Sequence, residues 1–524
     1  MSPASSHNSD HSDHSNYEDP RLKPTVEAVN WDVLLGIACK AQSVSTASWG
    51  KQVNGGYNVV RFLKLDDGQE TEIVVRVPYK QEDGTSDVHA VALARRIESE
   101  VASMEYVAAN STIPLPRIIA YSTEKDGGGV GSPFIIMTKV EGEQLVTHFD
   151  DMDDTQREAI LRQVIDITLQ FSKLRFDKIG ALFKGDGVTK PAYYVAPLAD
   201  ILGEDDLDFV KKATSKTYTN AVSYWNAIAT ANLEEIHREQ FGRSNKSYEY
   251  VMYWFIRSLV PALYDTGLDE NGFPLTPGDF HSQNILITDV DTRSPRITGI
   301  IDWEFTSTDP TTSYAQYPLF IVDHPAWPDD HPTKKRNIKD QKTFNRLVRE
   351  AESKLDPNGD LPLSRAFEKS AAPYMLQQCL TGGMFSALYE RFFNHIYGQT
   401  DDSDEEEEDS EKVENAKDEG EESKEEANQE NAKEKEEDSD DESYEEKFSV
   451  AYYDALMKGI LKKEAEQYDE EFLVKKAATA VLGEDVIVFE LTRQQFKAIV
   501  LENLDKFEEG SRVKRWLKVY GGQK

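Results

Sequence analysis

Three residues with oxygen-bearing side chains, Asp279, Asn284 and Asp302, lie in the stretch PLTPGDFHSQNILITDVDTRSPRITGIIDWE. It contains the pattern G-D-x-H-x-x-N, a short apolar run, a loop, a second apolar run and I-D-W-E. Phosphoryl transfer to a hydroxyl needs one carboxylate that accepts the hydroxyl proton. It also needs an amide and a second carboxylate to hold the magnesium that bridges the nucleotide phosphates. The spacing therefore indicates this reaction, with Asp279 as the base and the other two as metal ligands.

Each of these residues also has a structural explanation. Asp279 follows Pro-Gly and could bond its own backbone in a turn. Asn284 borders the apolar run ILI, and its amide oxygen suits magnesium beside charged phosphates. Asp302 ends the apolar run ITGIID, where a carboxylate needs a cation or donors, and a structural ion pair would meet that need. Their joint spacing favours the catalytic interpretation.

Arg76 interrupts the apolar run VVRVP and needs an anionic partner, which nucleotide phosphates, a helix carboxylate or both could supply. A helix is expected over about 88–109. With Ile97 at 0°, Glu100 lies at about 300°, near the apolar face, whereas Glu98 at about 100° faces away. We expect Glu100 to pair with Arg76 and to order a nucleotide site. A solvent-facing Glu100 is the alternative.

Two backbone segments could also hold a nucleotide. Gly55 and Gly56 lie between two apolar runs, where backbone N–H groups can approach phosphate closely. A plain hairpin turn is the alternative. The apolar run FIIMTKVEG ends in a turn, so backbone groups at Thr138 and Val140 could meet an adenine edge, or the run could simply end there. The expected cofactors are ATP, with GTP as an alternative, and Mg²⁺.

The elements that must position these residues read as an α+β protein. A helix is expected at 25–42, followed by three strands within 48–78, the helix at 88–109, and two strands joined by the glycine turn DGGGVGS. This pattern predicts a small lobe with a five-stranded antiparallel sheet and one helix, before a larger, mainly helical lobe. The second lobe contains short strands at ILI and ITGIID, and its helices are expected at about 155–175, 216–238, 246–264, 340–355 and 363–397.

Charge is unevenly distributed over the 524 residues, whose net charge is −36. Residues 401–450 hold 26 Asp and Glu against 6 Lys. This acidic tract could be a disordered solvated loop, a segment that binds a basic protein partner, or a phosphorylation target at Ser403, Ser410 or Ser439. The predicted organisation is a disordered tail at 1–20, an N-lobe with the nucleotide loop at 21–140, a helical C-lobe with the catalytic loop at 141–399, an acidic disordered insertion at 400–446 and final C-lobe helices at 447–524.

Composition argues against several classes of function. Without a basic face, nucleic-acid and anionic-membrane binding have no electrostatic support. Cys39 and Cys379 are too few for a disulfide framework, and no CxxC pair suggests zinc. No apolar run reaches the roughly 18 residues needed to span a bilayer, and the first twenty residues show no targeting pattern. These observations favour a cytoplasmic location.

The runs GGYN, VVRVP, ESEVASMEYV, IPLPRIIAY, PGDFHSQNIL and IDWEF, in this order, resemble the aminoglycoside phosphotransferase family. That family is similar to protein kinases in fold and includes choline-kinase-like enzymes, and this chain looks most like its fungal group over roughly 48–397. The resemblance implies a two-lobed kinase-like phosphotransferase acting on an unknown small-molecule hydroxyl. It makes Asp279 the catalytic base, Asn284 and Asp302 the magnesium ligands, Gly55 and Gly56 the phosphate loop, Glu100 the helix glutamate, and Thr138 and Val140 the adenine-binding hinge.

The sequence departs from the family pattern at two positions. Pro277 replaces the histidine of His-Gly-Asp, and Arg76 replaces the phosphate-binding lysine, keeping the charge in a larger, forked group. An inactive binding module whose acidic insertion recruits a partner is therefore an alternative. A protein kinase is less well supported, because I-D-W-E stands where Asp-Phe-Gly is expected and no Ala-Pro-Glu segment follows. Several aromatic residues could cage a cationic amine or simply pack the core: Tyr224, Trp225, Tyr248, Tyr250 and Trp254.

Overall fold

The computed structural model describes residues 19–80, 87–201, 208–238, 246–322, 331–357, 359 and 361–381. Contacts divide the chain into two compact units, Met1–Ala231 with Leu259–Ala387 and Asn232–Ser258 with Leu388–Lys524. All the residues of the candidate site belong to the first unit. The predictions for most of the N-terminal tail, for the acidic insertion at 400–446 and for the helices at 447–524 lie outside the described residues.

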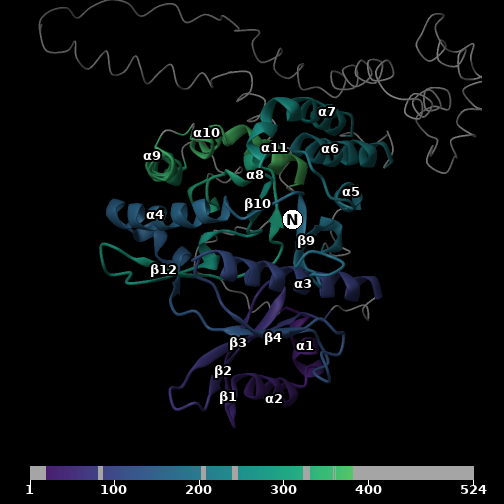
Figure 1. Cartoon of the computed structure of the whole chain (residues 1–524), viewed down its shortest axis with the longest axis vertical. Helices are drawn as coiled ribbons and strands as arrows, with labels where there is room; N and C mark the ends of the chain where they lie inside the picture. Colours follow the sequence, from purple (N-terminus) through teal and green to yellow (C-terminus); the bar gives the residue numbers. More distant parts are fainter. Residues whose placement is uncertain are drawn as a thin grey trace, which may run out of the picture. The chain divides into compact units, whose positions relative to one another are not determined.

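The first lobe contains the five-stranded antiparallel sheet that the sequence predicts, in the order β1-β2-β3-β5-β4 (Figure 1). The helix α3 follows β3 in the chain and packs against both β4 of this sheet and β8 (Gly180–Lys184) of the second lobe. The elements are β1 (Ala47–Asn54), β2 (Asn58–Leu65), β3 (Glu72–Pro78), α3 (Asp87–Asn110), β4 (Ile118–Ser122) and β5 (Phe134–Thr138).

Strand β3 explains how the sheet presents Arg76. Successive side chains of a strand point to opposite faces. Ile73, Val75 and Val77 are buried in one hydrophobic cluster with the helix α2 (Trp31–Gln42), whereas Val74 packs against a different cluster that includes α3. Arg76 shares the face of Val74. The same alternation that buries the valines therefore directs Arg76 toward α3.

The N-terminal helix predicted at 25–42 is two helices, α1 (Leu22–Ala28) and α2 (Trp31–Gln42). Asn30 separates them, because its backbone leaves the helical region and its side-chain oxygen accepts a hydrogen bond from the N–H of Val33. An asparagine that satisfies a free N–H group in this way starts a new helix. The apolar spacing alone did not reveal this break.

The second lobe is largely helical, as predicted. The helix expected at 363–397 is interrupted near Lys369, and its part beyond residue 381 lies outside the described residues. The helices are α4 (Asp154–Phe171), α5 (Asp208–Ala213), α6 (Ala221–Arg238), α7 (Lys246–Leu263), α8 (Thr311–Tyr314), α9 (Pro332–Leu355), α10 (Pro362–Glu368) and α11 (Ala371–Thr381).

This lobe also contains strands that the sequence analysis did not predict. A five-stranded sheet has the order β7-β10-β13-β8-β9, and a three-stranded sheet the order β12-β11-β6. Only β11 and β12, the expected strands at ILI and ITGIID, were anticipated. The strands are β6 (Glu143–Gln144), β7 (Arg175–Phe176), β8 (Gly180–Lys184), β9 (Tyr193–Ala196), β10 (Phe273–Thr276), β11 (Ile285–Thr288), β12 (Arg296–Ile300) and β13 (Ser307–Thr308).

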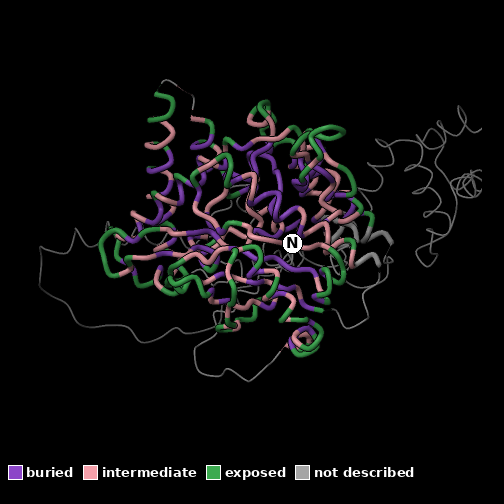
Figure 2. The backbone as a smooth tube through the Cα atoms, turned by 60° about the horizontal axis from the view of Figure 1, so that its bottom comes forward, coloured by how far each residue is buried: buried purple, intermediate pink, exposed green. Residues whose placement is uncertain are grey.

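One large hydrophobic cluster joins α3 and β5 to α4, α9 and the β11–β12 pair, with Trp303 and Phe171 fully buried in it. Figure 2 shows buried segments running through the interior while exposed residues follow the outer loops. A five-stranded sheet with α3 between β3 and β4 is followed by helices and by a strand pair next to the G-D-x-H-x-x-N and I-D-W-E segments. This arrangement is a protein-kinase-like α+β fold. In the described ranges, no helix is both long and apolar enough to cross a membrane.

Candidate active site

The loop between β10 and β11 positions Asp279. Gly278 begins this loop in a crowded place, because a Cβ there would lie 2.5 Å from the carbonyl oxygen of Phe305. Asn284 Nδ2 donates to the carbonyl oxygen of Asp279 at 3.0 Å and to its Oδ2 at 3.1 Å. His281 Nε2 lies 3.1 Å from Asp279 Oδ1. Both carboxylate oxygens of Asp279 are thus oriented by side chains of its own loop.

The contribution of His281 was not predicted, although the residue belongs to the G-D-x-H-x-x-N pattern. Its Nδ1 accepts a hydrogen bond from the N–H of Gln283 at 3.1 Å. In a neutral imidazole the other nitrogen then carries the proton, so Nε2 donates to Asp279. His281 therefore braces the aspartate in a chain where Pro277 occupies the position of the family's histidine.

Asp302 lies two residues after β12 and beside Asn284. The N–H of Ile301 donates to the carbonyl oxygen of Asn284 at 2.9 Å, so the two predicted metal ligands lie on adjacent strand ends. Asp302 has a φ of 61°, a left-handed conformation that is uncommon outside glycine. The buried Trp303 follows it and donates from its indole to the carbonyl oxygen of Ile300 at 2.9 Å. Among the described residues, the buried Oδ1 of Asp302 has no hydrogen-bond partner.

The predicted pairing of Arg76 with Glu100 is confirmed. Arg76 Nη2 bonds Glu100 Oε2, and Arg76 Nη1 lies 3.6 Å from Asp302 Oδ1. Burial raises the pKa of the Glu100 carboxyl to about 7, with Arg76 opposing the shift. Burial also acts to lower the pKa of Arg76, but the surrounding carboxylates outweigh it and raise that pKa above its ordinary value. Arg76 is therefore a permanent cation that forks between two acids.

A second cluster, centred on Glu304, was not predicted. Arg96 Nη1 from α3 lies 3.1 Å from Glu304 Oε1, and Asn58 Nδ2 from the start of β2 donates to Glu304 Oε2 at 3.4 Å. The rings of Tyr57 and Phe305 meet edge to face with centroids 6.2 Å apart. These contacts hold the β1–β2 turn against the segment that follows Asp302. Glu304 is the last letter of I-D-W-E, which was the available sign of its importance.

The predicted phosphate loop, Gly55 and Gly56, forms the β1–β2 turn. The N–H of Gly55 donates to the carbonyl oxygen of Asn58 at 2.9 Å, and the carbonyl oxygen of Gly56 accepts from Arg21 Nη2 at 3.1 Å. A Cβ on Gly56 would meet no described atom within 4 Å. The protein itself therefore does not require glycine at position 56.

The predicted hinge residues lie at the end of β5. The N–H of Thr138 donates to the carbonyl oxygen of Arg117 at 2.9 Å, so this group is already used within the sheet. Val140 packs against Gly299 of β12, where a Cβ would come within 2.5 Å of Val140 Cγ1. The structure thus brings the loop that carries Asp279 and Asn284 into one group with Asp302, Arg76 and Glu100. It places the glycine turn beside this group through Asn58 and Glu304. It adds no contact that tests the adenine-binding role.

Residues 49–221 match the model of the phosphotransferase enzyme family, abbreviated APH. Over this part, the chain is similar to that family. The match includes the sheet, α3 and the first part of the second lobe but ends before the loop that carries Asp279. The roles of Asp279, Asn284 and Asp302 in an APH domain therefore depend on their own geometry.

Similar curated proteins come from fungi. The relative named "Altered inheritance of mitochondria protein 9, mitochondrial" is 27% identical in Clavispora lusitaniae, over 30% of this chain and 28% of the relative. Its Komagataella phaffii counterpart is 22% identical over 49% of this chain and 46% of the relative. A subtelomeric hrmA-associated cluster protein of Aspergillus fumigatus is 29% identical over 25% of this chain and 24% of the relative. The chain spans less than half the length of these relatives.

These relatives correct the expected cytoplasmic location. The names of several of them state that the protein is mitochondrial, which points to mitochondria rather than the cytoplasm. The cytoplasmic expectation followed from the few cysteines and from the lack of a membrane-spanning run and of a recognisable targeting pattern, and such absences are no positive signal for any compartment.

Solved structures with a similar arrangement include the GDP complex of wild-type aminoglycoside 2'-phosphotransferase-IIIa. It is 14% identical, covers 69% of this chain and 98% of that one, and has a TM-score of 0.36. Macrolide 2'-phosphotransferase MphH from Brachybacterium faecium is 13% identical, covers 71% of this chain and 98% of that one, and has a TM-score of 0.34. Values this low assign neither a nucleotide nor a substrate.

Proposed function

We propose that this protein transfers the γ-phosphoryl group of a nucleoside triphosphate, ATP or GTP, to a hydroxyl of a small molecule in a magnesium-dependent reaction. The observation that carries the proposal is that Asn284 links Asp279, which it contacts directly, to the segment that carries Asp302. Asn284 bonds Asp279 through its side chain and receives the N–H of Ile301, the neighbour of Asp302, at its backbone. A base and two candidate metal ligands thus share one rigid corner of the fold.

The donor set fits magnesium. Mg²⁺ prefers oxygen ligands and commonly takes one or two carboxylates together with substrate phosphates. Asp302 offers a buried oxygen without a hydrogen-bond partner in the described part of the chain. Asn284 directs its Nδ2 to Asp279, which leaves its amide oxygen as the ligand. When bound, the ion would neutralise charge on the phosphates. Among the described residues, no group of three or more His, Cys, Asp or Glu could hold a metal ion, so the proposed ligand set depends on Asn284.

The chain's own residues would do the remaining work by orientation and charge. Asp279 accepts the proton of the attacking hydroxyl on a carboxylate oxygen, while His281 and Asn284 hold that carboxylate in place. Arg76 supplies a fixed positive charge for the phosphates, and Glu100 orients it.

The nucleotide itself would lie along the β1–β2 turn and the end of β5. Gly55 and Gly56 offer backbone N–H groups, and the space around Gly56 leaves room for close approach by phosphate. Because the N–H of Thr138 is used within the sheet, its carbonyl oxygen and the N–H of Val140 would meet the adenine edge. Glu304 would hold the turn in position through Asn58.

A non-catalytic binding module is the second candidate, and one observation favours it. Arg76 Nη1 lies 3.6 Å from Asp302 Oδ1, so the arginine competes with a metal for that oxygen. A module of this kind would bind nucleotide without magnesium or not at all.

Two variants of the full chain separate these functions. Asp279→Asn should lower ATP turnover, with water or an alcohol as acceptor, by about 10²- to 10⁴-fold, and should leave Mg²⁺–ATP affinity nearly unchanged. Asp302→Asn should remove the magnesium dependence of ATP binding, measured by calorimetry with and without the ion. Asp291→Asn, at an exposed acid in the β11–β12 connection, is the control. Wild-type turnover in Asp279→Asn would defeat the assignment.

A further inference from the structure

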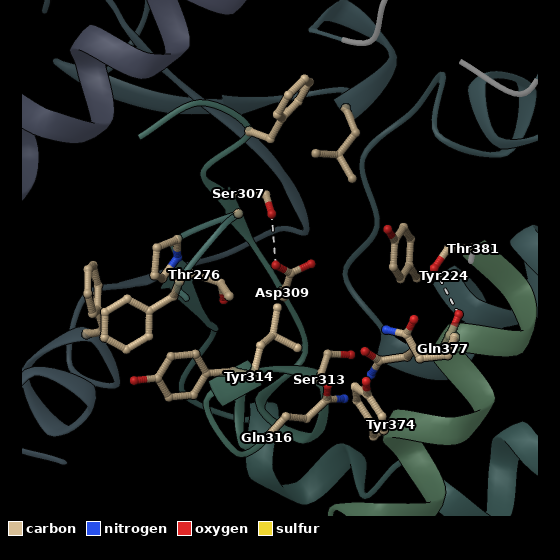
Figure 3. A pocket seen from close by; sticks show the side chains of 18 of the residues that line it. Tyr224, Thr276, Ser307, Asp309, Ser313, Tyr314, Gln316, Tyr374, Gln377 and Thr381 are labelled. Atoms are coloured by element: carbon tan, nitrogen blue, oxygen red, sulfur yellow. Dashed lines mark hydrogen bonds between the residues drawn. The ribbon is translucent and has the colours of Figure 1, made fainter. Parts of the chain in front are cut away.

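A cavity of about 280 Å³ adjoins the catalytic loop on its second-lobe side. One wall is formed by Pro277, Gly278 and Phe280, the neighbours of Asp279, together with Phe305. The facing walls come from α6, through Tyr224 and others, and from α11 (Figure 3). Its size lies at the lower end of the roughly 300–1,000 Å³ typical of ligand pockets.

Among the described residues that line this cavity, Asp309 has the one charged side chain. The chain as a whole contains 95 acidic residues, so acids are scarce here by local arrangement. The other lining residues are aromatic, aliphatic, hydroxyl-bearing or amides. The cavity therefore suits a ligand that is mostly apolar and has at most one positive charge.

Asp309 has no cationic partner among the described residues. It is 9% exposed, accepts a hydrogen bond from Ser307 Oγ at 2.8 Å, and donates from its N–H to the carbonyl oxygen of Pro274 at 3.1 Å. In the part of the chain that is described, no Lys, Arg or His side chain lies within ion-pair distance of it. A buried carboxylate that meets only hydroxyl groups is costly when ionised. A cation delivered by a ligand would remove this cost.

The polar groups of two aromatic side chains in the walls, Trp225 and Tyr314, are already hydrogen-bonded within the protein. The indole N–H of Trp225 donates to Ser313 Oγ at 3.1 Å, and the hydroxyl of Tyr314 donates to the carbonyl oxygen of Thr168. Tyr224 packs edge to face on Trp225 with ring centroids 5.1 Å apart. These rings therefore offer apolar surface and π-faces, both of which stabilise an ammonium group next to a carboxylate.

One further polar group is unsatisfied. Gln316 Nε2 is buried and has no hydrogen-bond partner among the described residues, and Gln316 also lines the cavity. Figure 3 shows Asp309 among the labelled polar side chains, with Tyr224 across the space from it. An amide donor and a carboxylate acceptor together fit a ligand that carries an oxygen and an amine.

We propose that this cavity binds the phosphoryl acceptor, and that the acceptor is a small, mostly apolar alcohol with a single amine whose ammonium group pairs with Asp309. This inference rests on the proposed function. In the reaction the acceptor oxygen forms a bond to the γ-phosphorus, the bond from that phosphorus to the β,γ-bridging oxygen breaks, and the hydroxyl proton passes to Asp279. A polycation is disfavoured, because its further ammonium groups would be buried without partners.

Calorimetry on the full chain tests the proposal with three probes: phenylalaninol, its neutral analogue 3-phenylpropan-1-ol, and the polycation kanamycin. Wild type should bind phenylalaninol at least ten-fold more tightly than the other two. Asp309→Asn should reduce the preference over the neutral analogue to within two-fold. Ser307→Ala keeps the carboxylate and should keep the preference, as should Asp177→Asn at an exposed surface acid.

Equal binding of the amine and the neutral alcohol, tighter binding of kanamycin, or no saturable binding of any probe would overturn the proposal. If Asp309→Asn fails to fold, the wild-type ranking of the three probes decides alone. Asp279→Asn separates this inference from the proposed function, because it should retain the amine preference while losing transfer. If Asp279→Asn kept both its turnover and its preference for the amine, the proposed function would be rejected, but the assignment of the cavity as an amine-binding site would stand.

Discussion

Two buried carboxylates of the second lobe differ in what surrounds them. Asp340 of α9 faces Arg157 of α4, whose Nε lies 3.1 Å from both carboxylate oxygens and whose Nη2 bonds one of them. The same guanidinium donates to the carbonyl oxygen of Phe149 and lies over that ring at 3.8 Å. Among the described residues, Asp309 has no such cation within ion-pair distance, and its side-chain partners are hydroxyl groups.

The difference separates a structural acid from one that is open to a ligand. A carboxylate saturated by a forked guanidinium has no capacity left for another partner, and it joins the two helices that contribute the pair. A carboxylate held by hydroxyl groups keeps its charge uncompensated and can be satisfied by a proton or a ligand cation. The group of Arg76, Glu100 and Asp302 is intermediate between these cases. Its arginine is buried and paired, but among the described residues one carboxylate oxygen of Glu100 and one of Asp302 have no hydrogen-bond partner.

The largest effect should come from breaking the saturated pair. Asp340→Ala leaves the buried Arg157 without its partner, so the free energy of unfolding should fall by about 3–5 kcal/mol. Urea denaturation followed by tryptophan fluorescence measures this. Asp154→Ala, which removes the exposed pair with Lys339 between the same two helices, is the matched control and should change the midpoint little. If Asp340→Ala changed the free energy of unfolding as little as Asp154→Ala, Asp340 could not be called a structural acid in contrast to Asp309.

A smaller effect of opposite sign is expected at Asp309. Burial raises its pKa to about 6 from an ordinary 3.8, so the folded protein holds this proton more tightly than the unfolded chain does. Ionisation therefore costs stability as pH rises through about 6. Asp309→Asn should increase the free energy of unfolding by up to about 3 kcal/mol at pH 8, at roughly 1.36 kcal/mol per pKa unit, and by almost nothing near pH 4.

Denaturation of wild type and Asp309→Asn at pH 4, 6 and 8, without ligand, checks this sign. Asp177→Asn at the surface should show no such pH dependence. If Asp309→Asn were less stable than wild type at pH 8, the carboxylate would serve the fold, as Asp340 does.

The smallest effect is expected at Arg76. Arg76→Lys keeps the charge beside Glu100 but cannot fork to Asp302 as well, so the free energy of unfolding should fall by only about 1 kcal/mol. Magnesium-dependent ATP affinity should change by less than ten-fold. The same denaturation and calorimetry experiments apply. A loss above about 3 kcal/mol would group Arg76 with Arg157 as a structural arginine.

The first lobe and the catalytic motif could be predicted because their signals are local. Alternating apolar residues defined β2 and β3, and helical phase placed Glu100 toward Arg76, a pairing that the structure confirms. The spacing of Asp279, Asn284 and Asp302 indicated a shared site, and the structure places them in contact through Ile301. Their chemical roles remain predictions.

The remaining features depend on contacts between distant residues. The strands of the five-stranded second-lobe sheet contain only two to five residues, too few to show alternation, and their partners come from far along the chain. Glu304 joins Arg96 and Asn58 across 208 and 246 positions. Asp309 looks like an ordinary loop acid in sequence, because its burial and its missing cation exist only in the folded protein.

The walls of the cavity have different freedom to vary. A Cβ at position 278 would clash with the backbone of Phe305, so a residue larger than glycine on this wall would displace the loop that carries Asp279. The opposite wall belongs to α6 and α11, where the indole N–H of Trp225 donates to Ser313 and the hydroxyl of Thr381 donates to the carbonyl oxygen of Gln377. If the cavity binds the acceptor as we propose, substitutions on those helices would change which molecule is accepted with less effect on Asp279, so acceptor choice and chemistry could diverge independently.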